Sequence, residues 1–145
     1  WPVGAPMEDT VAIVSMIQAG IPLAFPNMRI VASHAGGALP MLLQRLDNQA
    51  GWFMPNAPEP PSATARRLWY DSVVHGSTDA LACAIAAYGA ERLLLGTDFP
   101  YVQGEHFDRS VAFLAEAPVS EAVRAGIYGA TAAGLILGEA VAERT

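Results

Sequence analysis

Apolar residues fall into two alternating kinds of block along this chain. Three blocks, at 29–34, 69–74 and 92–98, are short and mostly apolar runs that end in polar residues. Runs of this kind are typical of strands that are buried on both faces of a parallel sheet. Other blocks carry apolar residues at helical spacing, most clearly Leu39, Leu42, Leu43 and Leu46. The alternation predicts an α/β fold with a parallel sheet.

Glycine, proline and serine set the expected ends of the remaining elements. A helix is expected over 10–19, and 51–62, which contains four prolines, is predicted to be a long loop. A short helix is expected over 63–68. Further along the chain, Ser77 is expected to cap a helix that ends at Gly89.

The composition fits one compact domain over residues 1–145. Hydrophobic residues make up 52% of the chain and charged residues 15%, which is ample material for a core. The net charge of −6 argues against a nucleic-acid partner, which would need a basic face. The longest apolar stretch, 11–17, is too short to span a membrane. Because the single cysteine, Cys83, forms no internal disulfide, a cytoplasmic location is expected.

Three polar side chains follow the ends of the predicted strands. His34 and Asp98 end the first and third runs, and His75 comes just after the second. Because the carboxyl ends of parallel strands lie side by side, we expect these three side chains to converge on one pocket. Imidazole nitrogen and carboxylate oxygen are ligands of divalent metals such as Zn²⁺, which activates a bound water.

Each of these residues is also compatible with a structural role. A histidine at a strand end often only completes internal hydrogen bonds, His75 fits an ordinary loop, and Asp98 is suited to bracing a turn. The alternative hypothesis is a non-catalytic open α/β module that binds a ligand or a protein. Strand order separates the two hypotheses, because a barrel segment has sequential neighbours whereas a doubly wound sheet has a reversal.

The three predicted strands also carry longer motifs. Residues 25–37 read Phe-Pro-Asn-Met-Arg-Ile-Val-Ala-Ser-His-Ala-Gly-Gly, 70–75 read Tyr-Asp-Ser-Val-Val-His, and 89–100 read Gly-Ala-Glu-Arg-Leu-Leu-Leu-Gly-Thr-Asp-Phe-Pro. In this order they resemble strands six, seven and eight of the amidohydrolase-related family, the aminocarboxymuconate-semialdehyde decarboxylase-like branch of the amidohydrolase superfamily. The resemblance implies that the chain is the C-terminal part, about strands six to eight with their helices, of a distorted (β/α)8 TIM barrel. Strands one to five would be absent from this partial barrel domain.

The resemblance also implies roles for the candidate residues around one divalent metal, commonly zinc. Asp98 would be the strand-eight metal ligand that handles the proton of the bound water, and His34 would hydrogen-bond that water or the substrate. His75 is a candidate substrate-binding residue. Members of this family take their other metal ligands from a His-x-His after strand one and a histidine after strand five. This sequence contains no His-x-His, so the metal would need ligands outside the chain.

The implied activity is that of a metal-dependent enzyme acting on a small carboxylated or cyclic molecule. Its chemistry would be either hydrolysis or non-oxidative decarboxylation, which the sequence leaves open. Because a metal site normally gathers at least three protein ligands, we expect this chain alone to be inactive. We expect it to depend on the missing N-terminal half of the barrel or on contacts with further copies.

Overall fold

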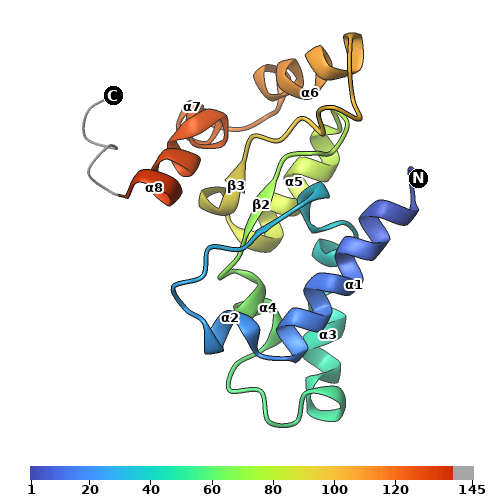
Figure 1. Ribbon diagram of the computed structural model, residues 1–145, viewed down its shortest axis with the longest axis vertical. Coiled ribbons are helices and arrows are strands. Elements are labelled where there is room, and N and C mark those ends of the chain that lie inside the picture. The colour runs from blue at the N-terminus through green and yellow to red at the C-terminus, as the bar shows by residue number, and fades with distance from the viewer. Residues whose placement is uncertain (139–145) are drawn as a thin grey trace.

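Three short parallel strands lie at the centre of the computed structural model, which describes residues 1–138 (Figure 1). They are β1 (Val31–Ala32), β2 (Trp69–Asp71) and β3 (Leu93–Leu94), paired in the order β1-β2-β3. Ala32 lies opposite Tyr70, which in turn lies opposite Leu93. The predicted α/β fold with a parallel sheet is therefore confirmed. The sequential order is the one that a barrel segment has, whereas a doubly wound sheet would contain a reversal.

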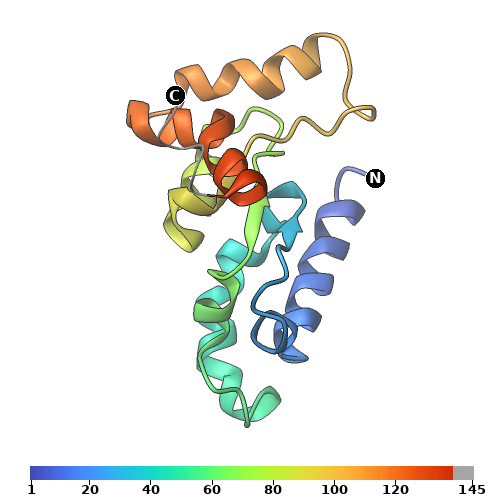
Figure 2. The same cartoon turned by 60° about the vertical axis from the view of Figure 1, so that its left-hand side comes forward.

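Helices connect the strands and pack around them (Figure 2). In chain order they are α1 (Gly4–Gln18), α2 (Ile21–Ala24), the 3₁₀ turn η1 (His34–Gly36), α3 (Leu39–Phe53), α4 (Pro61–Ala65), α5 (Thr78–Tyr88), the 3₁₀ turn η2 (Ala90–Arg92), α6 (Glu105–Glu116), α7 (Glu121–Ala125), the π-helical turn η3 (Gly126–Ala130) and α8 (Thr131–Leu137). The first of them, α1, lies against η1 and α3, so it runs along the β1 side of the sheet.

The strands are shorter than the apolar runs predict. Beyond β2, the Val73 N–H is not available to a neighbouring strand, because it donates to the Asp71 carboxylate at 3.0 Å. Similarly, the Gly96 N–H donates to the Ser72 hydroxyl at 3.2 Å. The Leu95 N–H donates to a carbonyl of η3 at 2.8 Å. The strand-end residues therefore hold their loops instead of extending the sheet.

The expected helix ends are confirmed at both ends of α5 and, to within one residue, at the end of α1 at Gln18, whereas other ends differ. Ser77 caps α5, since its hydroxyl accepts the Ala80 N–H at 3.2 Å, and Gly89 ends it with a φ of 98°. In contrast, α1 begins at Gly4 rather than at residue 10. The predicted loop 51–62 is helical at both of its ends, because α3 continues to Phe53 and α4 begins at Pro61 rather than at residue 63. Proline is tolerated at Pro61 because it occupies the first helical position.

The core lies between the sheet and the helices that cover it. At its centre the rings of Tyr70 and Tyr88 are stacked, with centroids 3.6 Å apart and planes at 4°. The Tyr70 hydroxyl donates to the Ala65 carbonyl at 2.8 Å. Burial raises the pKa of both tyrosines, so they stay neutral and act as hydrogen-bonding core residues. This pair links β2 to α4 and α5.

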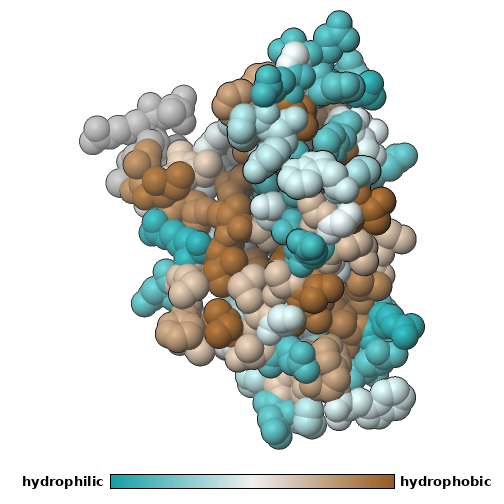
Figure 3. Space-filling view, turned by 45° about the vertical axis from the view of Figure 1, so that its right-hand side comes forward, coloured by the Kyte–Doolittle hydropathy of each residue, from teal (hydrophilic) through white to brown (hydrophobic). Residues whose placement is uncertain are grey.

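Large apolar side chains also remain on the surface of the described chain. Val3, just before α1, is 71% exposed, Val11 on α1 is 62% exposed, and Met41 on α3 is 81% exposed. Figure 3 shows apolar side chains gathered across the middle of one face. Surfaces of this kind are typical of contacts with further protein. Over residues 1–138, no helix has both the length and the apolar character that a membrane span needs.

Candidate active site

The three predicted site residues line one cavity of about 580 Å³. His34 reaches it from the turn after β1, His75 from the loop after β2, and Asp98 from the loop after β3. The expected convergence therefore occurs, and it occurs because the three strands are parallel neighbours.

The backbone is left-handed at all three of these residues. Among residues 1–138, the non-glycine residues with positive φ are His34 (51°), Ala35 (52°), His75 (51°) and Asp98 (61°). A side chain in this region of φ and ψ costs free energy and persists only where its surroundings hold it. In this chain the strained positions coincide with the residues that line the cavity, which favours a functional reason for them.

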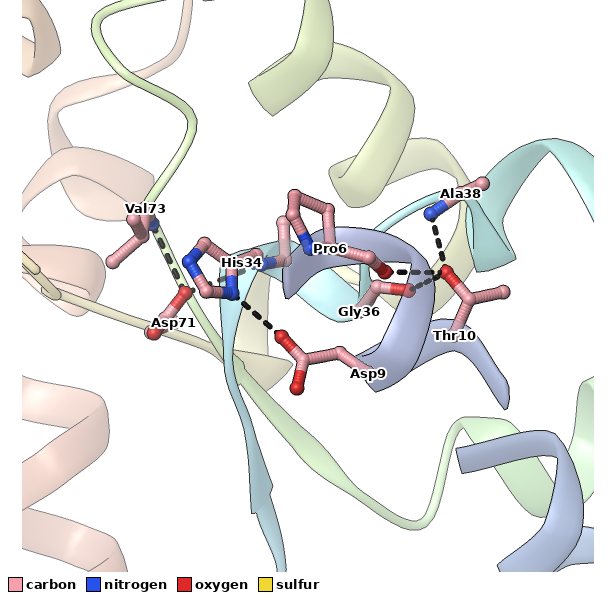
Figure 4. A network of polar contacts seen from close by, with 9 residues as sticks. Pro6, Asp9, Thr10, His34, Gly36, Ala38, Asp71 and Val73 are labelled. Atoms are coloured by element: carbon pink, nitrogen blue, oxygen red, sulfur yellow. Dashed lines mark hydrogen bonds and ion pairs between the residues drawn. The ribbon is translucent and has the colours of Figure 1, made fainter. Parts of the chain in front are cut away.

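The turn that carries His34 is held by side chains from three other elements. The Asp71 carboxylate at the end of β2 accepts the Ala35 N–H at 3.1 Å, and the Tyr88 hydroxyl on α5 donates to the Ala35 carbonyl at 3.3 Å. The Thr10 hydroxyl on α1 accepts the Ala38 N–H at 2.9 Å (Figure 4). The His34 turn is thus fixed from three sides.

Close packing around the same turn requires glycine at two positions. A Cβ atom at Gly36 would lie 2.7 Å from the Tyr88 hydroxyl oxygen, and one at Gly37 would lie 2.0 Å from the Pro6 carbonyl oxygen. Both glycines also have positive φ, 75° and 63°. The paired glycines after His34 therefore let α1 and α5 approach the turn closely.

The ring of His34 contacts a second carboxylate, on Asp9 of α1. Its Nδ1 lies 2.5 Å from Asp9 Oδ2, within a network of polar contacts that ends at Asp71 (Figure 4). Because Nδ1 is engaged in this way, Nε2 is the ring nitrogen left for a molecule in the cavity. Sequence reasoning missed Asp9, since it lies on a helix far from the predicted strand ends.

Asp71 is a buried carboxyl group that the sequence analysis also missed. Burial raises the pKa of this carboxyl, while the hydrogen bonds from the Val73 and Ala35 N–H groups act in the opposite direction. A Cβ atom at Gly96 would lie 2.7 Å from Asp71 Cβ, so the chain just after β3 must carry glycine where it passes this residue. The feature of the sequence that could have pointed to Asp71 is the presence of an acidic residue inside a run of strand-forming residues.

His75 and Asp98 sit on less enclosed loops than His34 does. His75 is exposed, and the Gly76 that follows it packs closely under Arg109 of α6. Asp98 is half-buried, and its carbonyl accepts the Val102 N–H at 2.9 Å, which closes a turn around it. Both side chains can therefore reach a ligand in the cavity from fixed backbone positions.

The donor set of this cavity does not by itself form a metal site. Carboxylate oxygen on Asp98 and imidazole nitrogen on His34 and His75 are suitable ligands for divalent metals. However, within residues 1–138 no three His, Cys, Asp or Glu side chains are grouped so that they could hold a metal ion. The described chain therefore supplies fewer ligands than a protein metal centre needs.

Apolar side chains form most of the remaining lining. The rings of Trp1 and Tyr101 meet there, with centroids 5.2 Å apart and planes at 45°. Met41, Val73 and Cys83 also contribute, and no lysine or arginine belongs to this lining of the described chain. Such a surface suits a mostly apolar small molecule that carries a few polar groups. Sequence reasoning had no signal for these lining residues.

Comparison with known proteins assigns the chain to a family. A sequence model of the amidohydrolase family matches residues 1–136, and the chain belongs to this family of enzymes. The 2-amino-3-carboxymuconate-6-semialdehyde decarboxylase of Caenorhabditis elegans is 34% identical over 111 residues, which cover 72% of this chain and 27% of that protein. The predicted resemblance to this branch of the superfamily is confirmed.

Two solved structures show the same arrangement of elements. The apo form of the Metarhizium anisopliae IDCase is 27% identical, with a TM-score of 0.81 over 96% of this chain and 42% of that one. A dihydroxybenzoic acid decarboxylase from Polaromonas sp., solved with bound manganese and the inhibitor 2-nitroresorcinol, is 24% identical, with a TM-score of 0.78 over 90% and 40%. The chain therefore spans well under half the length of the proteins that it resembles.

Proposed function

We propose that this chain is the C-terminal part of a metal-dependent decarboxylase that removes CO2 from a small carboxylated substrate. The observation that carries this proposal is the convergence of His34, His75 and Asp98 on one cavity from left-handed backbone positions. Membership of the amidohydrolase family supports it, and the names of the relatives favour decarboxylation over hydrolysis.

In the proposed reaction, the bond between the substrate carbon and its carboxylate breaks. The electron pair stays on that carbon, CO2 leaves, and a proton must arrive to replace it. We assign this step to His34 in its doubly protonated form, whose Nε2–H faces no protein partner among the described residues and gives its proton to that carbon, while Nδ1–H stays on Asp9. The ring is left neutral with its hydrogen on Nδ1, and water supplies the next proton to Nε2. The rigid turn keeps the imidazole in one position, which a proton transfer to carbon requires.

We assign the substrate-binding role to His75 and to the apolar lining. His75 is the exposed histidine of the cavity, so it can donate a hydrogen bond to a polar group on the substrate. Trp1 and Tyr101 offer ring surfaces to the apolar part of the substrate. Because this lining of the described chain contains no cationic side chain, the substrate carboxylate needs a positive partner from elsewhere.

We assign Asp98 as one ligand of a divalent metal whose other ligands lie outside this chain. When bound, such a metal would neutralise a negatively charged substrate group and polarise it. Within the described residues the remaining ligands are missing, which agrees with a barrel of which strands six to eight are present here. Manganese is the metal named for one structural neighbour, and zinc is the commonest alternative for this donor set.

The test is CO2 release from carboxylated aromatic acids by the protein that contains this chain and a strand-one-to-five segment. His34→Gln should lower kcat by about 10² or more, because general acid–base groups contribute that much. His106→Gln is the matched control, since His106 is an exposed histidine on α6 that does not line the cavity. Equal losses in both variants, or full activity in His34→Gln, would contradict the assignment.

A further inference from the structure

We infer that Asp9 is a positioning residue that fixes the tautomer and the orientation of the His34 ring. The Asp9 carboxylate on α1 and the His34 Nδ1 on the turn after β1 are 2.5 Å apart, although the two residues are 25 positions apart in sequence. This inference rests on the proposed role of His34 in proton transfer and adds a residue to it.

One tautomer of the neutral His34 ring is compatible with this contact. A carboxylate is only an acceptor when ionised, so the hydrogen atom of a neutral His34 ring must be on Nδ1 to make this contact. The Nε2 atom then carries a lone pair, which takes a proton from water, and the ring then donates that proton to the substrate carbon. Without Asp9, a neutral histidine in water favours the other tautomer, with its hydrogen on Nε2.

The surroundings of the pair make the contact well defined. The side chains of His34 and Asp9 are 19% and 31% exposed, so each is partly shielded from water. The backbone on both sides is fixed, since α1 is anchored to the same turn by the Thr10 hydroxyl, which donates to the Pro6 carbonyl at 2.8 Å and accepts the Ala38 N–H. Thr10 directly follows Asp9, so the anchor places the carboxylate beside the ring (Figure 4).

The charges around the ring are consistent with a positioning role. The second carboxylate near His34 is that of Asp71, which is committed to the backbone N–H groups of Ala35 and Val73. Asp71 therefore holds the turn, whereas Asp9 contacts the ring itself. Of these two carboxylates, Asp9 is the one whose loss would free the imidazole to rotate and to change tautomer without removing the backbone contacts of the turn.

The experiment is a long-range ¹H–¹⁵N correlation spectrum of the 145-residue chain labelled at histidine, in which His34→Gln identifies the His34 signals. The unsubstituted chain should show His34 with its hydrogen on Nδ1. Asp9→Asn should keep that tautomer, because the amide oxygen still accepts the bond, whereas Asp9→Leu should shift it to Nε2. Asp108→Leu, an exposed aspartate on α6, should leave the His34 signals unchanged.

Two results would overturn the inference. One is a His34 ring with its hydrogen on Nε2, or with averaged nitrogen shifts, in the unsubstituted chain. The other is an Nδ1–H tautomer that survives in Asp9→Leu. In the complete enzyme, Asp9→Leu should lower kcat at least about tenfold with little change in KM, and Asp9→Asn should restore part of that loss. If the spectra agree and kcat does not change, the proposed role of His34 fails while the positioning contact stands.

Discussion

The His34 turn is the most constrained part of the site at the scale of single residues. Left-handed backbone costs about 1–2 kcal/mol for each non-glycine residue, and His34 and Ala35 adopt it in succession. The Ala35 N–H donates to the Asp71 carboxylate and the Tyr88 hydroxyl donates to the Ala35 carbonyl, and these two hydrogen bonds offset that cost. Residues that do not themselves line the cavity should therefore control how well His34 is placed.

Gly36→Ala should destabilise the chain strongly, by about 2–4 kcal/mol. The added Cβ atom would lie 2.7 Å from the Tyr88 hydroxyl oxygen, at a residue whose φ is 75°. Gly51→Ala on α3 is the matched control, because nothing lies within 4 Å of its Cβ position, and it should be neutral or slightly stabilising. Urea unfolding measures both, and an equal effect of the two substitutions would refute this packing argument.

Asp71→Asn should remove a dependence of stability on pH. Burial raises the pKa of Asp71 in the folded chain above its ordinary value of 3.8, so the folded state holds this proton more tightly than the unfolded state. Its contribution to stability is therefore fully present below 3.8 and is lost as the pH rises through the folded pKa. Asparagine does not titrate and still accepts the Ala35 and Val73 N–H groups.

The measurement is the difference in unfolding free energy between the unsubstituted chain and Asp71→Asn as a function of pH. This difference should fall as the pH rises above 3.8 and then level off. Asp79→Asn, an exposed aspartate at the start of α5, provides the baseline. A difference that grows with pH would mean that hydrogen bonding, and not burial, dominates the pKa of Asp71.

At the scale of elements, the sequence predicted those helix ends that are set by contacts between residues close in sequence. The cap at Ser77 and the stop at Gly89 follow from short-range hydrogen bonding and backbone freedom, and both were predictable. The extent of the helices over 51–62 was not, because α4 begins where Asp47 on α3 accepts the Ser62 N–H, a contact between residues 15 positions apart. The sequence shows the prolines of this segment but not the carboxylate that caps its helix.

Ser77→Ala should lower stability by about 1 kcal/mol. The substitution removes the oxygen that accepts the Ala80 N–H at the start of α5, and that donor has no other partner within the helix. Thermal or urea unfolding would show this as a lower midpoint. Ser15→Ala in the last turn of α1 should have a smaller effect, because the Ser15 hydroxyl only donates to the Val11 carbonyl of its own helix. A larger loss in Ser15→Ala would argue against the cap.

The candidate site likewise contains residues that the sequence predicts and residues that it does not. The meeting of His34, His75 and Asp98 was predictable because parallel strands bring their carboxyl ends together. Asp9 and Asp71 were not identified. The role of Asp9 depends on which face of α1 packs against the His34 turn, and that of Asp71 depends on which residue at the end of β2 lies beside that turn. The sequence therefore predicted the two histidines and the aspartate that face the cavity, and the structure adds the carboxylates that hold the His34 turn and ring.

At the scale of the whole molecule, the described chain leaves strand edges unpaired, apolar side chains exposed and a metal site without enough ligands. Its sheet has three strands, with β1 and β3 at the edges, and α1 presents exposed apolar side chains. No three side chains of residues 1–138 are grouped to hold a metal. These features agree with a segment that covers 27% of one curated relative and 42% of one structural neighbour.

The isolated 145-residue chain should show no manganese-dependent decarboxylation. Because it supplies Asp98 without a complete set of ligands, manganese should bind only weakly, and Asp98→Asn should change that binding little. Calorimetric titration with manganese and an assay of CO2 release check both expectations, with Asp108→Asn as the exposed control. Robust metal-dependent turnover by the chain alone would contradict the need for ligands outside it.

The most direct test of the central claim is the sequence of the encoding locus, read in frame upstream of Trp1. If this cavity is one side of a metal-dependent decarboxylase site, that sequence should encode a His-x-His after a first strand and, later, a histidine after a fifth strand. Those histidines would supply the ligands that the described chain lacks. A start codon close to Trp1, with no such histidines before it, would contradict the claim that this chain is the C-terminal part of one continuous barrel.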